Sequence, residues 1–146
     1  MTRAETPLFV VNVEGVVRRE TRYLLTVRSD AEPHAPGTLA LPGGKLEPTD
    51  PQTASLEATL TRELLEETGV RAEDFRYLES KWFLTDDGEA VADVVFLCNY
   101  AGGELAVGDP DEIAEVLWLT AAEVLAHPKA PPWTRATIEK AEQLRL

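Results

Sequence analysis

Three glutamates, Glu63, Glu66 and Glu67, lie close together near the end of a segment with helical periodicity. On a helix of 3.6 residues per turn, Glu63 and Glu67 continue the apolar stripe formed by the leucines within residues 56–64. An uncompensated carboxylate on a buried face is costly, and the helix dipole also disfavours anions in a last turn. A hard divalent cation, Mg²⁺ or Mn²⁺, bound by several carboxylate oxygens would remove both penalties. The pattern therefore indicates a metal site, with a solvated acidic helix face as the alternative.

A helix over residues 51–68 is needed to place these glutamates on one face. Asp50 is a good N-cap before Pro51 at the first helical position, and Gly69 suits a left-handed helix end. The strands expected over residues 8–17 and 23–28 should pair antiparallel and be joined by residues 18–22. The pattern predicts strands over residues 8–17, 23–28, 38–41, 75–84, 91–100 and 115–119, and further helices over residues 121–126 and 133–146. This order of elements predicts an α/β fold with a mixed sheet covered by helices.

Two segments around the predicted helix resemble the two ends of the Nudix box. They are residues 41–44 (LPGG) and residues 62–70 (RELLEETGV). The family pattern is Gly, any five residues, Glu, any seven, then Arg-Glu-aliphatic-any-Glu-Glu-any-Gly-aliphatic. The second half matches at every specified position. In the first half, Asp50 stands where the family has Glu, and 11 residues instead of seven separate it from Arg62.

The four extra residues correspond to about one helical turn. An extension of that length at the helix start would leave the later glutamates on the same face. We interpret Asp50 as the N-cap of this longer helix rather than as a substitute for the box glutamate.

The resemblance, which extends from the first strand to about Trp118, implies a Nudix-like α/β/α sandwich with a mixed sheet, in a single domain over residues 1–146. It also implies Mg²⁺-dependent hydrolysis of the diphosphate bond in a nucleoside diphosphate linked to another group. The resemblance implies that Glu63 and Glu67 are the principal metal ligands and that Glu66 is a further ligand or binds through water. It also implies that a backbone carbonyl near Gly43 or Gly44 completes the coordination and that Arg62 is an orienting residue.

Hydrolysis also needs a carboxylate that accepts a proton from the attacking water. In the Nudix family this base is a box glutamate or an acid of a later loop, and here residues 108–115 (GDPDEIAE) supply Asp111, Glu112 and Glu115, of which we favour Glu112 or Glu115. An ordinary acidic loop is the alternative for that segment. Arg28 and Lys45 are candidates to bind a phosphate, although single basic residues are usually solvated.

The substrate class stays open within nucleoside diphosphate derivatives. Residues 24–44 partly resemble the signature of coenzyme A diphosphatases, with Pro33 and Leu41 departing from it. ADP-ribose, nucleotide sugars, dinucleoside polyphosphates and nucleoside triphosphates are further candidates. A catalytically silent Nudix-like domain that binds a nucleotide is the alternative function, favoured by the altered spacing around Asp50.

The composition of the chain disfavours some classes of binding partner. The 146 residues contain 26 acids and 14 bases, and a net charge of −12 opposes binding to nucleic acids and anionic membranes. No apolar run approaches the length of a membrane helix. The single cysteine, Cys98, cannot form an internal disulfide, which is typical of a cytoplasmic protein. We therefore expect a cytoplasmic protein with a small-molecule partner, for which a homodimer is possible.

Overall fold

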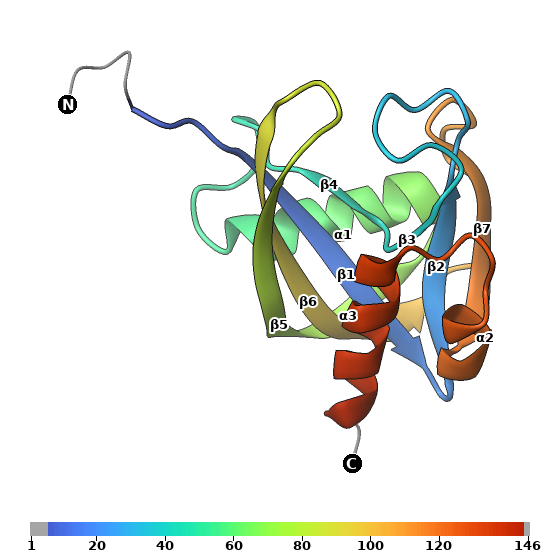
Figure 1. Ribbon diagram of the computed structural model, residues 1–146. Coiled ribbons are helices and arrows are strands. Elements are labelled where there is room, and N and C mark those ends of the chain that lie inside the picture. Colours follow the sequence, from blue (N-terminus) through green and yellow to red (C-terminus); the bar gives the residue numbers. More distant parts are fainter. Residues whose placement is uncertain (1–5, 145–146) are drawn as a thin grey trace.

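A mixed β-sheet organises the structure, a computed structural model that describes residues 6–144 (Figure 1). β1 (Val10–Arg19) pairs antiparallel with β2 (Arg22–Arg28) and parallel with β6 (Ala90–Gly102). Within the described residues the strand order is β3-β2-β1-β6-β5, while β4 pairs with β1 and β7 pairs with β2. The other elements are β3 (Leu39–Ala40), β4 (Gly43–Lys45), α1 (Ser55–Thr68), β5 (Arg71–Leu84), β7 (Ile113–Thr120), α2 (Ala121–Leu125) and α3 (Pro132–Gln143).

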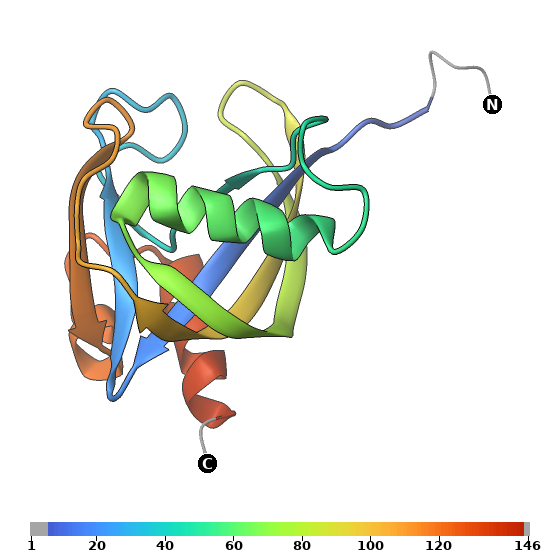
Figure 2. The same cartoon turned by 180° about the vertical axis from the view of Figure 1, so that it is seen from behind.

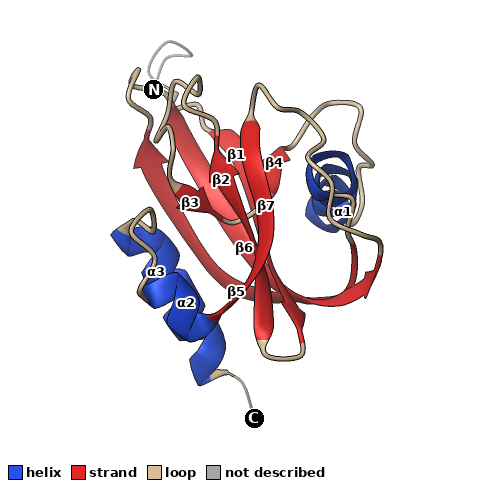
Figure 3. Cartoon of the chain, turned by 90° about the vertical axis from the view of Figure 1, so that its right-hand side faces the viewer, coloured by secondary structure: helices blue, strands red, loops and turns tan. Residues whose placement is uncertain are grey.

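The sheet separates two apolar cores. Figure 2 shows α1 crossing one face of the sheet, and Figure 3 shows α2 and α3 on the opposite face. Leu60 and Leu64 of α1 are fully buried against Val13 and Val17 of β1. On the other face, buried side chains of α2 and α3 pack against Val16 of β1 and against alternate residues of β2 and β6. The predicted α/β/α sandwich with a mixed sheet is therefore confirmed, and so is the apolar stripe of the helix.

The start of α1 differs from the prediction. The helix begins at Ser55 rather than at residue 51, and its N-cap is Ala54, whose side chain makes no capping hydrogen bond. The prediction of Asp50 as the N-cap was therefore wrong. The carboxylate of Asp50 instead accepts hydrogen bonds from the guanidinium of Arg62. The four extra residues lie in the loop before α1, so they leave the phase of the helix unchanged.

Other boundaries differ by a few residues because strand pairing decides them. The expected connection over residues 18–22 is shorter, since Arg19 pairs with Arg22 across a tight turn. The expected turn at residues 42–44 leads directly into β4, which pairs with β1. The predicted last helix ends at Gln143, and its final residues 145 and 146 lie outside the described residues. None of the described helices has the length and apolar character needed to cross a membrane.

Candidate active site

A cleft of about 350 Å³ opens where the second half of α1 faces β4. Its walls include predicted site residues from four elements: Glu63 and Glu67 of α1, Gly44 and Lys45 of β4, Arg28 at the end of β2, and Glu112 in the loop before β7. These residues are up to 84 positions apart in the chain, from Arg28 to Glu112. The fold thus brings carboxylates and cationic side chains around one small space.

Close packing between α1 and β4 fixes the position of Glu63. A methyl group on Gly44 would lie 2.3 Å from the carboxyl carbon of Glu63, so only glycine leaves room for this carboxylate. Arg62 donates a hydrogen bond from Nη1 to Oε1 of Glu63 at 2.7 Å. Burial raises the pKa of Glu63, and Arg62 only partly opposes this effect.

Glu67 lies one helical turn further along the same face. Its Oε1 accepts a hydrogen bond from the backbone N–H of Gly43 at 3.1 Å. Burial and the nearby charge of Glu63 raise the pKa of Glu67 to about 8. Within the described chain, no basic side chain forms an ion pair with Glu67. The cleft therefore holds two neighbouring carboxylates with too little positive charge around them.

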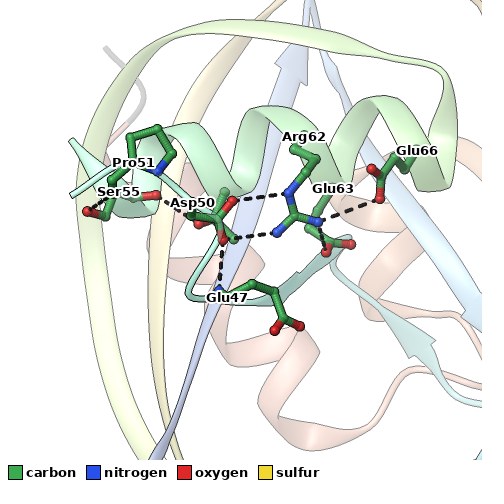
Figure 4. Close-up of polar contacts among 8 residues, drawn as sticks. Glu47, Asp50, Pro51, Ser55, Arg62, Glu63 and Glu66 are labelled. Carbon is green, nitrogen blue, oxygen red and sulfur yellow. Dashed lines mark hydrogen bonds and ion pairs between the residues drawn. The ribbon is translucent and has the colours of Figure 1, made fainter. Parts of the chain in front are cut away.

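Arg62 is held from its other side by Asp50 (Figure 4). Its Nε and Nη2 donate to the two carboxylate oxygens of Asp50 at 3.2 and 3.1 Å, and the backbone N–H of Glu47 donates to Asp50 as well. The side chain of Asp50 is only 6% exposed, and these donors lower its pKa to about 2. The fork of two hydrogen bonds fixes the plane of the guanidinium. Asp50 thus orients Arg62, which in turn holds Glu63.

Two predicted site residues lie away from the cleft walls. The side chain of Glu66 is 62% exposed, and its carboxylate is 3.6 Å from Nη1 of Arg62 (Figure 4). Glu115 is exposed on β7, opposite Val27 of β2. Glu66 therefore lies beside Glu63 through Arg62 without lining the cleft, whereas Glu115 is not brought to these residues, and the roles of Glu66 and Glu115 stay predictions.

Arg28, Lys45 and Glu112 of the acidic loop are further charged residues of the cleft wall. Arg28 donates from Nε to the backbone oxygen of His34 at 2.9 Å, which holds its guanidinium in place. The ammonium of Lys45 is exposed and lies 3.9 Å from Glu89. Burial, followed by the charge of Asp109, raises the pKa of Glu112. Its backbone oxygen accepts a hydrogen bond from the N–H of Ser29, which ties the acidic loop to the end of β2.

The sequence patterns missed two polar residues of the cleft wall and a third that contacts one of them. Asn12 and Glu14 of β1 line it, and Asp93 of β6 contacts Asn12. A signal was present, because these residues interrupt the apolar stretches VVNVEGVV and VADVVF. A polar residue in a central strand needs a hydrogen-bonding partner, and only the strand register identifies it.

The donor set of the cleft fits a hard divalent cation. Glu63 and Glu67 supply carboxylate oxygens, and burial raises the pKa of both groups, a cost that a bound cation would offset. Within residues 6–144, no group of three or more His, Cys, Asp or Glu side chains is already arranged to bind a metal ion. Two crowded carboxylates on one helix face are nevertheless suited to Mg²⁺, which is commonly bound by one or two carboxylates together with water and substrate phosphates.

Without metal, we expect the melting temperature to fall by about 5–10 °C between pH 5 and pH 8. The folded pKa of Glu67, about 8, lies above its ordinary value of 4.5, so the folded state binds more protons throughout this window and loses stability as pH rises. After discounting for partial exposure, the effect is about 2–3 kcal/mol. Thermal melts in EDTA and in excess Mg²⁺ would measure it. Mg²⁺ should flatten the profile, and so should Glu67→Gln in EDTA; an equally steep profile in that variant would contradict the assignment.

Comparison with known proteins agrees with this geometry. The NUDIX domain family model matches residues 8–141. A MutT-like protein of Streptomyces ambofaciens is 36% identical over 118 residues, covering 81% of this chain and 68% of that protein. The NAD-capped RNA hydrolase NudC of Photobacterium profundum is 31% identical over 130 residues, covering 89% of this chain, which spans 44% of NudC.

A solved structure extends the similarity to the fold. The crystal structure of a MutT NUDIX hydrolase from Burkholderia pseudomallei superimposes with a TM-score of 0.76 and 26% identity, covering 92% of this chain and 98% of that one. The family match spans almost all of the described residues and includes the helix and the glycines that form the cleft. The chain therefore belongs to the Nudix hydrolase family, a family of pyrophosphohydrolases.

Proposed function

We propose that this chain hydrolyses, with Mg²⁺, the diphosphate bond of a small nucleoside diphosphate derivative. The observation that carries the proposal is the pair Glu63 and Glu67, which face one cleft in which Arg62 pairs with Glu63 while no basic side chain of the described residues pairs with Glu67. The same cleft has Arg28 and Lys45 on its walls, where they can meet phosphate oxygens. This combination suits a dense anion that binds together with a divalent metal ion.

Each group in the cleft has a role that follows from its contacts. Bound Mg²⁺ would supply positive charge to the diphosphate oxygens and acidify the attacking water. Glu63 and Glu67 would hold the cation, together with the carbonyl of Gly44, while Glu66 at the exposed end of the cluster would act through water. The Gly43 N–H and Arg62 keep the two cleft carboxylates in place before substrate binds. Such preorganisation lowers the reorganisation needed in the transition state.

Glu112 is the better placed of the two loop candidates for the proton acceptor. It lines the cleft and has a raised pKa, which favours a base that works near neutral pH, whereas Glu115 lies outside the cleft walls. Glu67, with its higher pKa, is the box residue that could serve instead when it is not bound to metal.

The size and charge of the protein favour small substrates. A cleft of about 350 Å³ accommodates a diphosphate with part of an attached sugar or base, and the net charge of −12 opposes long polyanions. The relative NudC acts on NAD-capped RNA, in which a diphosphate joins two nucleosides. ADP-ribose, nucleotide sugars, nucleoside triphosphates and coenzyme A all carry the same bond, and together they form the candidate panel.

A screen of that panel with purified protein tests the proposal. We expect Mg²⁺-dependent release of a nucleoside monophosphate or of 3′,5′-ADP from at least one member, and loss of this release in EDTA. Product identity by chromatography would show which bond is cleaved. If no member is hydrolysed with Mg²⁺ or Mn²⁺ while one still binds, the chain is instead a nucleotide-binding domain without catalysis.

A further inference from the structure

A polar cluster on β1 and β6 has no part in the metal chemistry described above. Asn12 lies opposite Asp93 in the parallel pairing of these strands, and its Nδ2 donates to Oδ1 of Asp93 at 2.8 Å. Glu14 lies two residues further along the same face of β1, and its carboxyl is close enough to that of Asp93 for the two to interact. The side chain of Asp93 is buried, with 1% of its surface exposed. Two carboxyl groups thus lie next to each other on this face of the sheet.

The second oxygen of Asp93 lacks a donor. No N–H or O–H group of residues 6–144 donates a hydrogen bond to Oδ2. Lys81 lies opposite Asp93 on β5, but its ammonium is within 3.5 Å of Glu79 and Thr137 instead. Burial and the neighbouring carboxyl of Asp93 raise the pKa of Glu14, only partly opposed by Lys81 and Arg28. Asp93 is therefore a buried carboxyl next to Glu14 that keeps unused hydrogen-bonding capacity on Oδ2.

Packing alone does not account for these residues. Replacing buried charged groups by apolar residues of similar volume is often neutral or stabilising. The neighbouring positions on the same face of β1 and β6, Val16, Val95 and Leu97, are apolar and buried in the core against α3. The change from apolar to polar side chains occurs where β1 reaches the cleft, because Asn12 and Glu14 line its walls.

The cluster lies next to the place where the diphosphate would bind. Glu14 pairs with Gly43 in the β1–β4 register, and the N–H of Gly43 holds Glu67. A diphosphate bound at Glu63 and Glu67 therefore leaves its attached sugar or base within the same small cleft as Glu14. A carboxyl pair at this point offers acceptors to hydroxyl or N–H donors and repels further phosphate groups.

We propose that Glu14, held by Asp93 and Asn12, is the specificity residue that accepts a hydrogen bond from a neutral donor of the group joined to the diphosphate. The donor is an O–H or N–H group, supplied either by a ribose or by the edge of a nucleobase. This inference rests on the proposed function, because it assigns the part of the substrate that lies next to the scissile diphosphate. A site built around a hydrogen bond rejects an analogue without the donor strongly, since its own buried acceptor is then left unpaired.

The test compares a parent compound with analogues that each lack one donor. The parent is the member of the panel ADP-ribose, UDP-glucose, ATP and coenzyme A that binds most tightly in Mg²⁺. One analogue lacks a ribose hydroxyl and a second lacks a donor on the base, so the two arms separate the sources. For wild type, we expect one analogue to bind at least about tenfold more weakly than the parent. In Glu14→Leu, the ratio of the Kd of that analogue to the Kd of the parent should fall toward one, because the parent should bind more weakly.

Matched variants keep the result interpretable. Glu47→Leu removes another glutamate from the cleft wall outside the cluster, and it should leave the ratio unchanged. If Glu14→Leu does not fold, Glu14→Met retains the length of the side chain without its carboxylate acceptors, and it should reduce the ratio at least about threefold. Ratios within twofold of wild type in the folded Glu14 variant, or equal losses on parent and analogues, would overturn the inference. Because Kd is read directly, a protein that binds but does not hydrolyse would refute the proposed function alone.

Discussion

Replacing Glu67 by glutamine should lower kcat by about 10³-fold while leaving the protein at least as stable as wild type at pH 8. The activity falls because one of the two cleft carboxylates that would hold the cation is lost, and groups that stabilise transition-state charge typically contribute 10²–10³-fold, about 3–4 kcal/mol. The stability is maintained because the glutamine cannot ionise, whereas burial of the Glu67 carboxylate disfavours its charged form. Loss of activity without loss of stability distinguishes a functional carboxylate from a structural one.

Steady-state kinetics on the hydrolysed panel member and thermal melts at pH 8 would measure both effects. Glu57→Gln is the matched control, because Glu57 lies in the first turn of the same helix and outside the cleft walls. We expect its kcat to stay within about twofold of wild type. Turnover near the wild-type value in Glu67→Gln, with Mg²⁺ still required, would refute the role of Glu67 as a ligand.

The adjacent glycines of β4 should respond to alanine in opposite ways. In Gly44→Ala, the new methyl group would lie within 2.6 Å of all three carboxyl atoms of Glu63, a flexible side chain that can move away. We expect kcat/KM to fall by about 10²-fold, because displacing a catalytic group by about 1 Å has effects of that size. The melting temperature should change by less than about 3 °C.

Gly43→Ala should instead destabilise the fold. Its methyl group would lie 2.0 Å from the backbone oxygen of Val13, and the backbone of β1 cannot move away without breaking the pairing of β1 with β4. We expect a loss of about 2–3 kcal/mol, seen as a melting temperature lower by about 10 °C. Thermal melts and kinetics on both variants would separate the two cases. Wild-type activity in Gly44→Ala would show that the position of Glu63 against β4 is not required.

The position of Asp50 explains how the altered box spacing is tolerated. The four extra residues form a loop before Ser55, and this loop returns Asp50 to Arg62, with which it forms two hydrogen bonds (Figure 4). An aspartate thus orients the arginine from the place where the family pattern has glutamate. The observation that favoured a silent domain, the changed spacing at Asp50, therefore does not disturb the arrangement of Arg62 and Glu63.

The sequence by itself determined the part of the site that lies within one helix. The periodicity of the leucines placed Glu63 and Glu67 on the face toward the sheet, and both are partly buried there. This succeeds because 3.6 residues per turn fixes the relative direction of side chains three and four positions apart, whatever surrounds the helix. The match to the Nudix box belongs to the same local information.

Only the tertiary structure decided contacts between distant segments. Asn12 and Asp93 are separated by 81 positions and meet because β1 and β6 run parallel in one register. The role of Asp50 likewise depends on the path of a loop, and local capping preferences predicted the wrong partner for it. Strand register and loop path follow from burial summed over the whole sheet, which a local pattern does not contain. The helix supplied the two carboxylates proposed to hold the metal ion, and the packing of the sheet against it decided which other residues share the cleft.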